Sequence, residues 1–435
     1  MPLMRLLVTN THTPQAFAII RALRPHSERI VVVDEGTGLR PALAHGSHSR
    51  LVDKRYRVPS PESDWAAGRV TGENTPSESA FVDAVSRICR DERIDVIFPS
   101  WDPYVSVLSK NRAHFEQLGV TIPVPEFSTV LMALDKHRTI EAAQSVGFPC
   151  PRTYLYESLD QLREIEAREG FPLVLKPRFT SGGRGMVIVN SREELDAALP
   201  GILETHGAPL VQEYIPGGNR TSVQLVLDKR GVVVFAFHKL RHRTFKRTAR
   251  LATVSESARP DERVLQSATL LQKLGWWGAM GIETIRDPRD GLNKLMEVNP
   301  RFPRQLWNRT ELGINEPLLC VKIARGETVE PVGEYPVGVL FVSPVEDVQL
   351  FALQLLDRFV SVARAYFTGR PTLDGSIPDL SFPEQCESFL GTYRSHKRKV
   401  WDPYSRYFFK DPVTSLLWWG QFATWVAGAA KQVGR

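Results

Sequence analysis

The first hundred residues repeat a strand–helix–strand pattern, and this pattern restricts the chain to few folds. Residues 4–9 and 29–35 are apolar runs rich in β-forming residues, and residues 15–24 between them carry apolar side chains at helical spacing. A helix over 78–91 and a strand over 94–100 repeat the unit. Alternation of this kind predicts an α/β domain with an open parallel sheet and helices on its faces.

Ligands of open parallel sheets bind at the carboxyl ends of the strands. We therefore expect a crevice near the polar residues that follow or end these strands: Asn10, Asp34, Ser100 and Asp102. A chain of 435 residues is too long for one ordinary core, so two or three domains are expected.

The middle of the chain alternates strands with tight turns. Residues 171–177 and 185–190 are expected strands on either side of a glycine-rich turn. Two hairpins are expected next, one turning at residues 228–231 and the other at residues 287–291.

The second of these hairpins carries residues suited to hold a metal ion. Side chains on a strand alternate between faces, so Glu297, Asn299 and Arg301 point the same way. Glu283 lies on the preceding strand and can sit opposite them. Carboxylate and carboxamide oxygens suit magnesium, and the arginine fork can neutralise a phosphate or carboxylate. The alternative is an ordinary hairpin whose polar side chains face solvent.

The glycine-rich turn, residues 180–185, is a candidate phosphate loop because glycines let backbone N–H groups approach phosphate oxygens. It lacks the Lys-Ser/Thr ending of a Walker loop and opens no helix, so it matches neither the Walker nor the dinucleotide-binding fingerprint. A flexible turn is the alternative. Lys176 ends the preceding strand, and Lys136 begins a helix, where a cation is unfavourable unless an anion binds. Both are candidate phosphate ligands, with solvated surface charges as the alternative.

These features follow one another in a fixed order: Lys136, Lys176, the loop 181–186 (SGGRGM), the segment 212–217 (QEYIPG), Glu283, and residues 297–301 (EVNPR). The order resembles the ATP-grasp superfamily of carboxylate–amine ligases, which includes biotin carboxylase, D-alanine–D-alanine ligase and the carbamoyl phosphate synthetase large subunit. The resemblance covers residues 5–330, and ExNPR after a strand is its most specific motif.

The resemblance implies three parts of the chain. Residues 1–125 would form an N-terminal α/β domain with an open parallel sheet, the pre-ATP-grasp domain. Residues 126–330 would form an ATP-grasp fold of two α+β subdomains, a small lid over 150–212 and a C-terminal subdomain over 213–330. Residues 331–435 would be a C-terminal extension that ends in an apolar helix.

The resemblance also implies roles for individual residues. Lys136 and Lys176 would hold the ATP phosphates, under a loop formed by Ser181, Gly182, Gly183, Gly185 and Met186. The main chain at a hinge would read adenine, at Glu213, Tyr214 and Ile215. Magnesium or manganese would be held by Glu283, Glu297 and Asn299. Arg301 would meet the acyl phosphate or substrate carboxylate, and Lys239 and Arg241 would contact phosphate or substrate.

Two features depart from the family pattern. Many members carry an acidic ribose ligand seven positions after the hinge glutamate, where this chain has Arg220, so Asn219 or Gln224 would take that role. The stretch 238–250 carries six basic residues and no acid, which equals the net charge of +6: Lys239, Arg241, Arg243, Lys246, Arg247 and Arg250. We interpret this stretch as a contact for an anionic substrate or product rather than for nucleic acid, with a solvated loop as the alternative.

The implied reaction joins a small anionic carboxylate to an amine. The carboxylate would attack the γ-phosphate of ATP to give an acyl phosphate and ADP, and the amine would then displace phosphate. Two alternatives stay open. One is phosphorylation of a small acid or carbamate without ligation, and the other is an ATP-binding scaffold or sensor without catalysis.

The cysteines and the termini bear on location. Four cysteines without a CxxC pair indicate reduced thiols and a cytoplasmic protein, and the first residues lack the pattern of a signal peptide. Residues 416–430 are apolar almost all round but too short to span a bilayer. We expect a helix that packs on the core or in a homodimer contact, with peripheral membrane binding as the alternative.

Overall fold

The computed structural model describes residues 2–36, 44–62, 65, 70–180, 183–217, 220–244, 252–355 and 382–431. The chain divides into two compact units. Unit 1 comprises Met1–Leu240 and Ala258–Tyr335, and unit 2 comprises Arg241–Ser257 and Pro336–Arg435. The predicted domain boundaries near residues 125 and 330 stay predictions.

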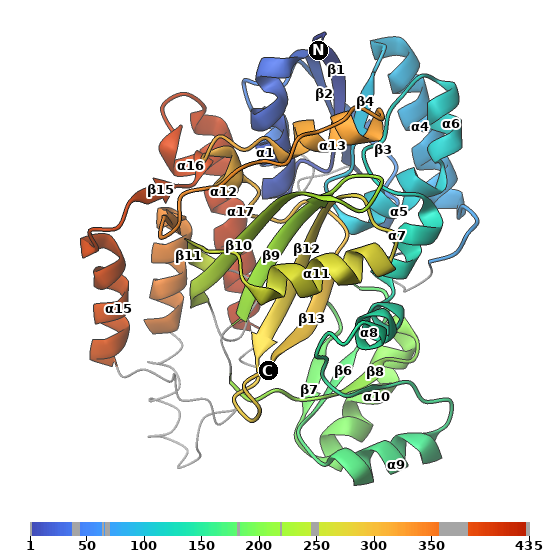
Figure 1. Cartoon of the computed structure of the whole chain (residues 1–435), viewed down its shortest axis with the longest axis vertical. Coiled ribbons are helices and arrows are strands. Elements are labelled where there is room, and N and C mark those ends of the chain that lie inside the picture. Colours follow the sequence, from blue (N-terminus) through green and yellow to red (C-terminus); the bar gives the residue numbers. More distant parts are fainter. Residues whose placement is uncertain are drawn as a thin grey trace. The chain divides into compact units, whose positions relative to one another are not determined.

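Unit 1 begins with a four-stranded parallel sheet of order β3-β2-β1-β4, which confirms the open parallel sheet predicted for this region (Figure 1). Its strands are β1 Met4–Thr9, β2 Ser27–Glu35, β3 Lys54–Val58 and β4 Val96–Phe98. The helices of this region are α1 Pro14–Leu23, α4 Pro76–Glu92, α5 Asp102–Lys110, α6 Arg112–Gln117, α7 Phe127–Leu134 and α8 Lys136–Ser145. Strands β1, β2 and β4 are largely apolar, and their side chains Leu7, Val31 and Ile97 are fully buried, whereas the edge strand β3 (KRYRV) is mostly exposed.

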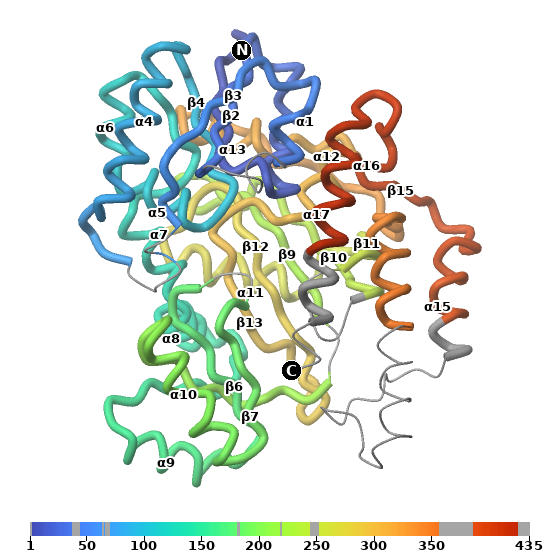
Figure 2. Tube along the Cα trace, turned by 180° about the vertical axis from the view of Figure 1, so that it is seen from behind, coloured from blue at the N-terminus to red at the C-terminus, as the bar shows by residue number. Residues whose placement is uncertain are grey.

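A small antiparallel sheet of order β5-β8-β6-β7 follows. Its strands are β5 Thr153–Tyr154, β6 Leu173–Lys176, β7 Val187–Val189 and β8 Leu210–Glu213. Helices α9 Leu159–Glu169 and α10 Arg192–His206 pack against it, and Leu162, Leu175 and Leu195 share one buried cluster. Figure 2 shows this sheet and its two helices as a lobe of unit 1. Strands β6 and β7 are the predicted strands on either side of the glycine-rich turn.

The sheet that carries the predicted metal ligands has the order β13-β12-β9-β10 within unit 1, and its neighbouring strands are antiparallel. The strands are β9 Arg220–Leu227, β10 Val233–Thr244, β12 Gly278–Arg286 and β13 Asn293–Asn299. The accompanying helices are α11 Glu262–Lys273, α12 Trp307–Thr310 and α13 Glu316–Ala324. Both predicted hairpin turns are present, since Asp228 N–H donates to the Val232 carbonyl and Asp287 N–H to the Leu292 carbonyl.

Unit 2 contains three short strands, β11 Ala252–Ala258, β14 Leu340–Val342 and β15 Lys399–Trp401. Strand β14 pairs with β11 antiparallel and with β15 parallel. The helices of its described part include α15 Phe382–Arg394, α16 Pro403–Arg406 and α17 Pro412–Lys431, and residues 344–355 are also helical. The predicted apolar final helix is therefore present as α17.

Helix α17 is anchored within unit 2 by its first half. Trp418 is buried, stacks on Tyr404 at 5.2 Å between ring centroids, and donates its indole N–H to Glu346 at 2.7 Å. Phe422, one turn further on, is also buried. These contacts agree with the expectation of a helix packed on the core. Among the helices of the described ranges, none is long and apolar enough to cross a membrane.

Candidate functional site

Two acids face each other on the hairpin of β12 and β13. Glu283 and Glu297 are directly opposite in the strand register, and both are half-buried. Like charges in this arrangement destabilise a sheet. A bound cation would remove the repulsion, so the placement fits the predicted metal site. Among the described residues no group of three or more His, Cys, Asp or Glu could hold a metal, and the predicted set has only two such carboxylates.

The register extends this pair into a polar row across the sheet. Glu283 is also opposite Ser222 of β9, and Ser222 is opposite Lys239 of β10. Residues in register on neighbouring strands share a face of the sheet, about 4.8 Å apart per strand. The row therefore reads Glu297, Glu283, Ser222 and Lys239. Lys239 is buried and donates to Gln305 Oε1 at 2.6 Å.

The same face holds two buried oxygens for which the described part of the chain offers no hydrogen-bond partner. They are Ser222 Oγ and Gln224 Oε1. Gln224 lies close over Gly281, where a Cβ atom would come within 2.8 Å of Gln224 Oε1. Buried polar atoms without partners are rare and point to a missing partner such as a ligand or water. Gln224 is predicted from the sequence only as a substitute ribose contact. Ser222 is not predicted, and its register position opposite Glu283 is the signal that identifies it.

The two predicted phosphate lysines lie beside these acids. Lys176, the last residue of β6, donates to the Met296 carbonyl of β13 at 2.6 Å. Burial lowers the pKa of Lys176, and the negative charges of Glu297 and Glu283 raise it by less. Burial and the charge of Lys176 lower the pKa of Lys136 to about 8, although the negative charge of Glu297 raises it. Lys176 thus lies against β13 beside Glu297, and Lys136 is influenced by both Lys176 and Glu297. That the two lysines and the two glutamates form one site stays a prediction.

Lys136 is held at the start of helix α8. Asp135 caps this helix by accepting from His137 N–H, and Arg178 binds both Asp135 oxygens at 2.7 Å. The Lys136 ammonium donates to the carbonyls of Arg178 and Thr180. The lysine is therefore tied to the segment that opens the glycine-rich turn.

The glycine-rich turn joins β6 to β7, but Ser181 and Gly182 lie outside the described residues. Gly183 and Gly185 have positive φ angles of 63° and 69°. A Cβ atom on Gly185 would come within 2.8 Å of Pro177, so only glycine fits there. Met186 closes the turn by donating its N–H to the Gly183 carbonyl. The geometry is that of a tight loop, and its role toward phosphate stays a prediction.

Arg301 is bound by residues of the N-terminal sheet region. Its Nε lies 3.0 and 3.1 Å from the two oxygens of Asp102, the first residue of α5, and its Nη2 donates to Asn299 Oδ1 at 3.0 Å. Its guanidinium lies over the Trp101 ring at 5.3 Å, and Arg184 of the glycine-rich turn lies 5.7 Å from the same ring. Asp102 is one of the residues predicted to lie near a crevice, but no sequence pattern indicates its pairing with Arg301 or the position of Trp101.

The predicted hinge starts where β8 ends. Tyr214 and Ile215 form no strand or helix, and β9 begins at Arg220. The side chain of Glu213 is buried and paired with Arg152 at 2.9 Å and Arg289 at 3.0 Å. The hinge glutamate thus uses its carboxylate in ion pairs and donates its main-chain N–H to the Arg152 carbonyl at 2.9 Å. The predicted adenine contact of this segment stays a prediction. Arg152 and Arg289 are distant from Glu213 in the chain, and no local pattern indicates these ion pairs.

The basic stretch is divided between the two units. Lys239 belongs to unit 1 and Arg241 to unit 2, and residues 245–251 lie outside the described ranges. Arg243 is buried in unit 2, where it pairs with Asp347 at 2.8 Å and donates to Thr392. Because the Arg243 guanidinium is bound by residues of its own unit, the interpretation of Arg243 as a substrate contact is corrected. The role of Arg241 stays a prediction.

Comparisons with known proteins find a matching domain family and distant relatives. Residues 133–304 match the model of the ATP-grasp domain family. The chain is 26% identical over 261 residues to the carbamoyl phosphate synthase large chain of Xylella fastidiosa, a match that covers 57% of this chain and 24% of that protein. The chain thus spans about a quarter of the length of this curated relative.

Solved structures share the fold at low sequence identity. The biotin carboxylase domain of 2-oxoglutarate carboxylase from Hydrogenobacter thermophilus superposes with a TM-score of 0.59 and 18% identity, over 76% of this chain and 72% of that chain. N5-carboxyaminoimidazole synthetase from Staphylococcus aureus superposes with a TM-score of 0.56 and 13% identity, over 78% and 81%. Residues 133–304 therefore form an ATP-grasp domain, in a chain distantly similar to carbamoyl phosphate synthase large chains and biotin carboxylases.

Proposed function

We propose that this chain is an ATP-dependent, ADP-forming ligase that activates a small carboxylate as an acyl phosphate and joins it to an amine. The observation that carries the proposal is the convergence of Lys136 and Lys176 on the opposed pair Glu283 and Glu297. Two cations for phosphate oxygens beside two acids for a metal are the parts that phosphoryl transfer needs.

The nucleotide would lie between the small sheet and the sheet of β9, β12 and β13. In our proposal the two lysines bind its phosphates, and the glycine-rich turn, including Ser181, Gly182, Gly183, Gly185 and Met186, closes over them. The main chain of Glu213, Tyr214 and Ile215 reads adenine. The orphaned oxygens of Ser222 and Gln224 are additional groups on the proposed ligand face.

The donor set fits magnesium or manganese. Two carboxylates and the carboxamide of Asn299 are hard oxygen ligands, and opposed carboxylates favour a cation between them. A bound magnesium ion supplies charge neutralisation for the transferring phosphoryl group. Asn299 Oδ1 accepts from Arg301 in this structure, so the amide links the proposed metal ligands to the proposed substrate arginine.

Arg301 would bind the carboxylate that is activated. Asp102 holds its Nε, and the Trp101 ring packs against the guanidinium plane, so the fork has a fixed orientation. An arginine held in this way can receive a carboxylate or the acyl phosphate formed from it. Lys239 and Arg241 are proposed as further contacts to phosphate or substrate.

Relatives support a small acid as substrate. The Hydrogenobacter structure holds MgADP, ADP and bicarbonate and is a dimer, and the Staphylococcus enzyme holds ADP. Bicarbonate in a protein of the same fold favours one second candidate function, phosphorylation of a small acid or carbamate without ligation. A homodimer is likewise a proposal for this chain.

The test is ADP release screened over pairs of carboxylates and amines with magnesium present, with mass spectrometry of the products. The proposal expects ADP release that needs the acid and a condensed product that contains the amine. ADP release without consumption of any amine would support the second candidate. Nucleotide binding without ADP release across the whole screen would contradict both and favour a non-catalytic scaffold or sensor.

A further inference from the structure

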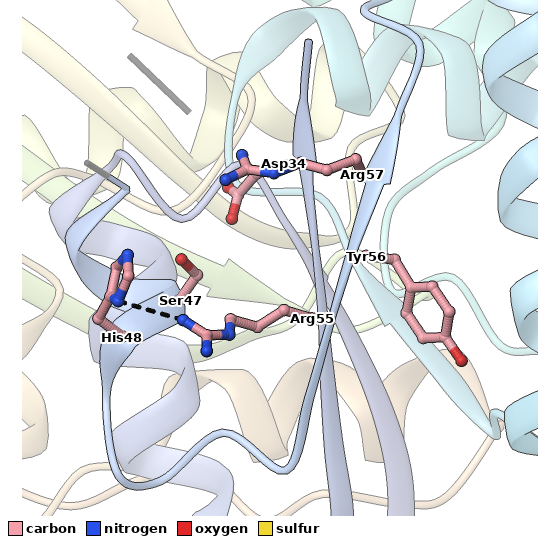
Figure 3. A pocket seen from close by; sticks show the side chains of 6 residues that line it. All are labelled: Asp34, Ser47, His48, Arg55, Tyr56 and Arg57. Carbon is pink, nitrogen blue, oxygen red and sulfur yellow. Dashed lines mark hydrogen bonds between the residues drawn. The ribbon is translucent and has the colours of Figure 1, made fainter. Parts of the chain in front are cut away.

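A pocket of about 240 Å³ lies in the N-terminal region of unit 1, apart from the residues assigned to ATP. It is lined by residues of β2, β3 and the turn 45–48: Asp34, Ser47, His48, Arg55, Tyr56 and Arg57. Figure 3 shows the arginine side chains on one side of β3 and Tyr56 pointing to the other. Tyr56 donates to Glu92 at 2.5 Å, so its hydroxyl is used elsewhere.

Strand alternation explains why both arginines reach the pocket. Arg55 and Arg57 are two residues apart on β3, so they share a face, and they are in register with Val32 and Asp34 of β2. Lys54 and Tyr56 lie on the opposite face, where both bind Glu92. The positive charge of Lys54 on this face is thus neutralised by Glu92.

The pocket face is different. Arg55 donates to His48 Nδ1 at 3.1 Å (Figure 3). Within the described ranges, no acid lies at ion-pair distance from either arginine of the pocket. Arg57 lies beside Asp34, but both oxygens of Asp34 already accept from Thr11, at 2.7 to 2.9 Å.

The charge of the pocket is therefore positive. Burial raises the pKa of Asp34, although the hydrogen bonds from Thr11 and the charge of Arg57 oppose this shift. Two exposed guanidinium groups stand against this single, internally bonded acid. Arginine forks at a concave surface match phosphate and carboxylate oxygens in geometry and in charge.

We propose that this pocket binds an oxyanion, a phosphate or a carboxylate, that belongs to the small acid activated by unit 1. Arg55 and Arg57 bind its oxygens, and His48 and Ser47 complete the wall. Asp34 and Asp102, the residue that holds Arg301, both lie where strands of the same parallel sheet end. The substrate class is then a small acid with a second acidic group. This identification rests on the proposed function, whereas oxyanion binding itself does not.

The test separates the two statements. Inorganic phosphate and succinate are titrated by calorimetry into the full chain saturated with MgADP, so that the proposed nucleotide site is filled. Arg55→Gln and Arg57→Gln are compared with Arg87→Gln, an exposed arginine on α4. We expect about tenfold weaker binding of at least one anion in each pocket variant, the scale of a charge-assisted contact, and no change in the control. Arg55→Lys keeps the charge without the fork and should fall between.

Equal affinity in all variants, or no binding of either anion by the wild-type chain, would overturn the pocket. A preference for phosphate or for succinate identifies the acidic group. With a turnover substrate in hand, both pocket variants should raise the KM of the acid and leave the KM of ATP unchanged. If no acid supports ADP release but the anion titrations behave as expected, the proposed function fails and the pocket stands.

Discussion

The acids at the two ends of the β12–β13 hairpin lie in different electrostatic environments. At the tip, Asp287 is fully buried and accepts from Arg289 at 2.9 Å and from Lys294 at 2.7 Å. At the other end, Glu283 and Glu297 oppose each other across the strands. Hydrogen bonds from Arg289, then Lys294, hold the pKa of Asp287 well below its usual range. The tip acid accepts direct hydrogen bonds from two cations, whereas the opposed glutamates, with Lys176 and Lys136 nearby, form the proposed site for a metal ion.

We interpret Asp287 at the tip as a structural acid and the opposed pair Glu283 and Glu297 as functional acids. The tip network extends through Arg289 to Glu213, so it ties the hairpin to the end of β8. Its removal should cost stability. The opposed glutamates repel each other and the nearby lysines offset this repulsion, so replacing one glutamate should cost function and leave the fold intact.

The largest expected effect is on turnover. Glu297→Gln should reduce ATP-dependent ADP release by at least about 100-fold, because it removes charge stabilisation from the transferring phosphoryl group. The same change should alter the stability of the metal-free protein by no more than about 1 kcal/mol, because relief of the repulsion with Glu283 is offset by lost attraction to Lys136 and Lys176. Steady-state ADP release and thermal unfolding in EDTA check both. Wild-type turnover in this variant would remove Glu297 from the site.

The next largest effect is on the fold. Asp287→Asn should lower the free energy of unfolding by about 2 to 3 kcal/mol, because the buried Lys294 ammonium loses its shortest ion pair and keeps only Asp290 at 3.0 Å and Glu213 at 3.6 Å. Urea unfolding measures this change. A loss below about 1 kcal/mol would mean that the tip is not the structural end of the hairpin.

A pH titration tests whether Lys136 takes part in the proposed ATP site. The pKa of Lys136 is lowered to about 8, so the lysine is charged below that pH and becomes neutral above it. The charged form binds phosphate, so ATP affinity should fall as the pH rises above about 8. At one pH unit above the pKa of Lys136 in the ATP-free protein, the affinity should be about tenfold lower than at low pH. Calorimetric titration of ATP at pH 7 to 9.5 follows this. Lys136→Arg should abolish the dependence, and an unchanged profile would exclude Lys136 as the titrating group.

The smallest effect concerns the contact between the hairpin tip and the hinge. Arg289→Gln removes a partly exposed pair with Glu213 and should cost about 0.5 to 1 kcal/mol beyond the loss of its contact with Asp287. A double-mutant cycle with Glu213→Gln isolates this term. A coupling of zero would show that the tip does not hold the hinge.

Local sequence signals predicted the fold well. Apolar strands, glycine turns and helix caps are encoded by neighbours in the chain, and the parallel sheet, the glycine turn between β6 and β7 and both hairpins followed from them. Strand alternation also placed Glu283 opposite Glu297.

Partners distant in the chain were not predictable. Asp102 and Arg301 are 199 residues apart, and nothing local to either indicates their pairing. The burial of Arg243 against Asp347 was missed for the same reason, and its cluster of positive charges was interpreted as a ligand contact. A single sequence shows charge and periodicity, but it does not show which oppositely charged residues the fold brings together.

The most direct test of the central claim is calorimetric titration of ATP, with magnesium and with EDTA, into wild type, Glu297→Gln and Asp287→Asn under conditions where all three are folded. We predict that magnesium tightens ATP binding in wild type and in Asp287→Asn, and that this magnesium-dependent gain falls at least about tenfold in Glu297→Gln. A gain from magnesium that is equal in all three proteins would contradict the assignment of the opposed glutamates as the metal site.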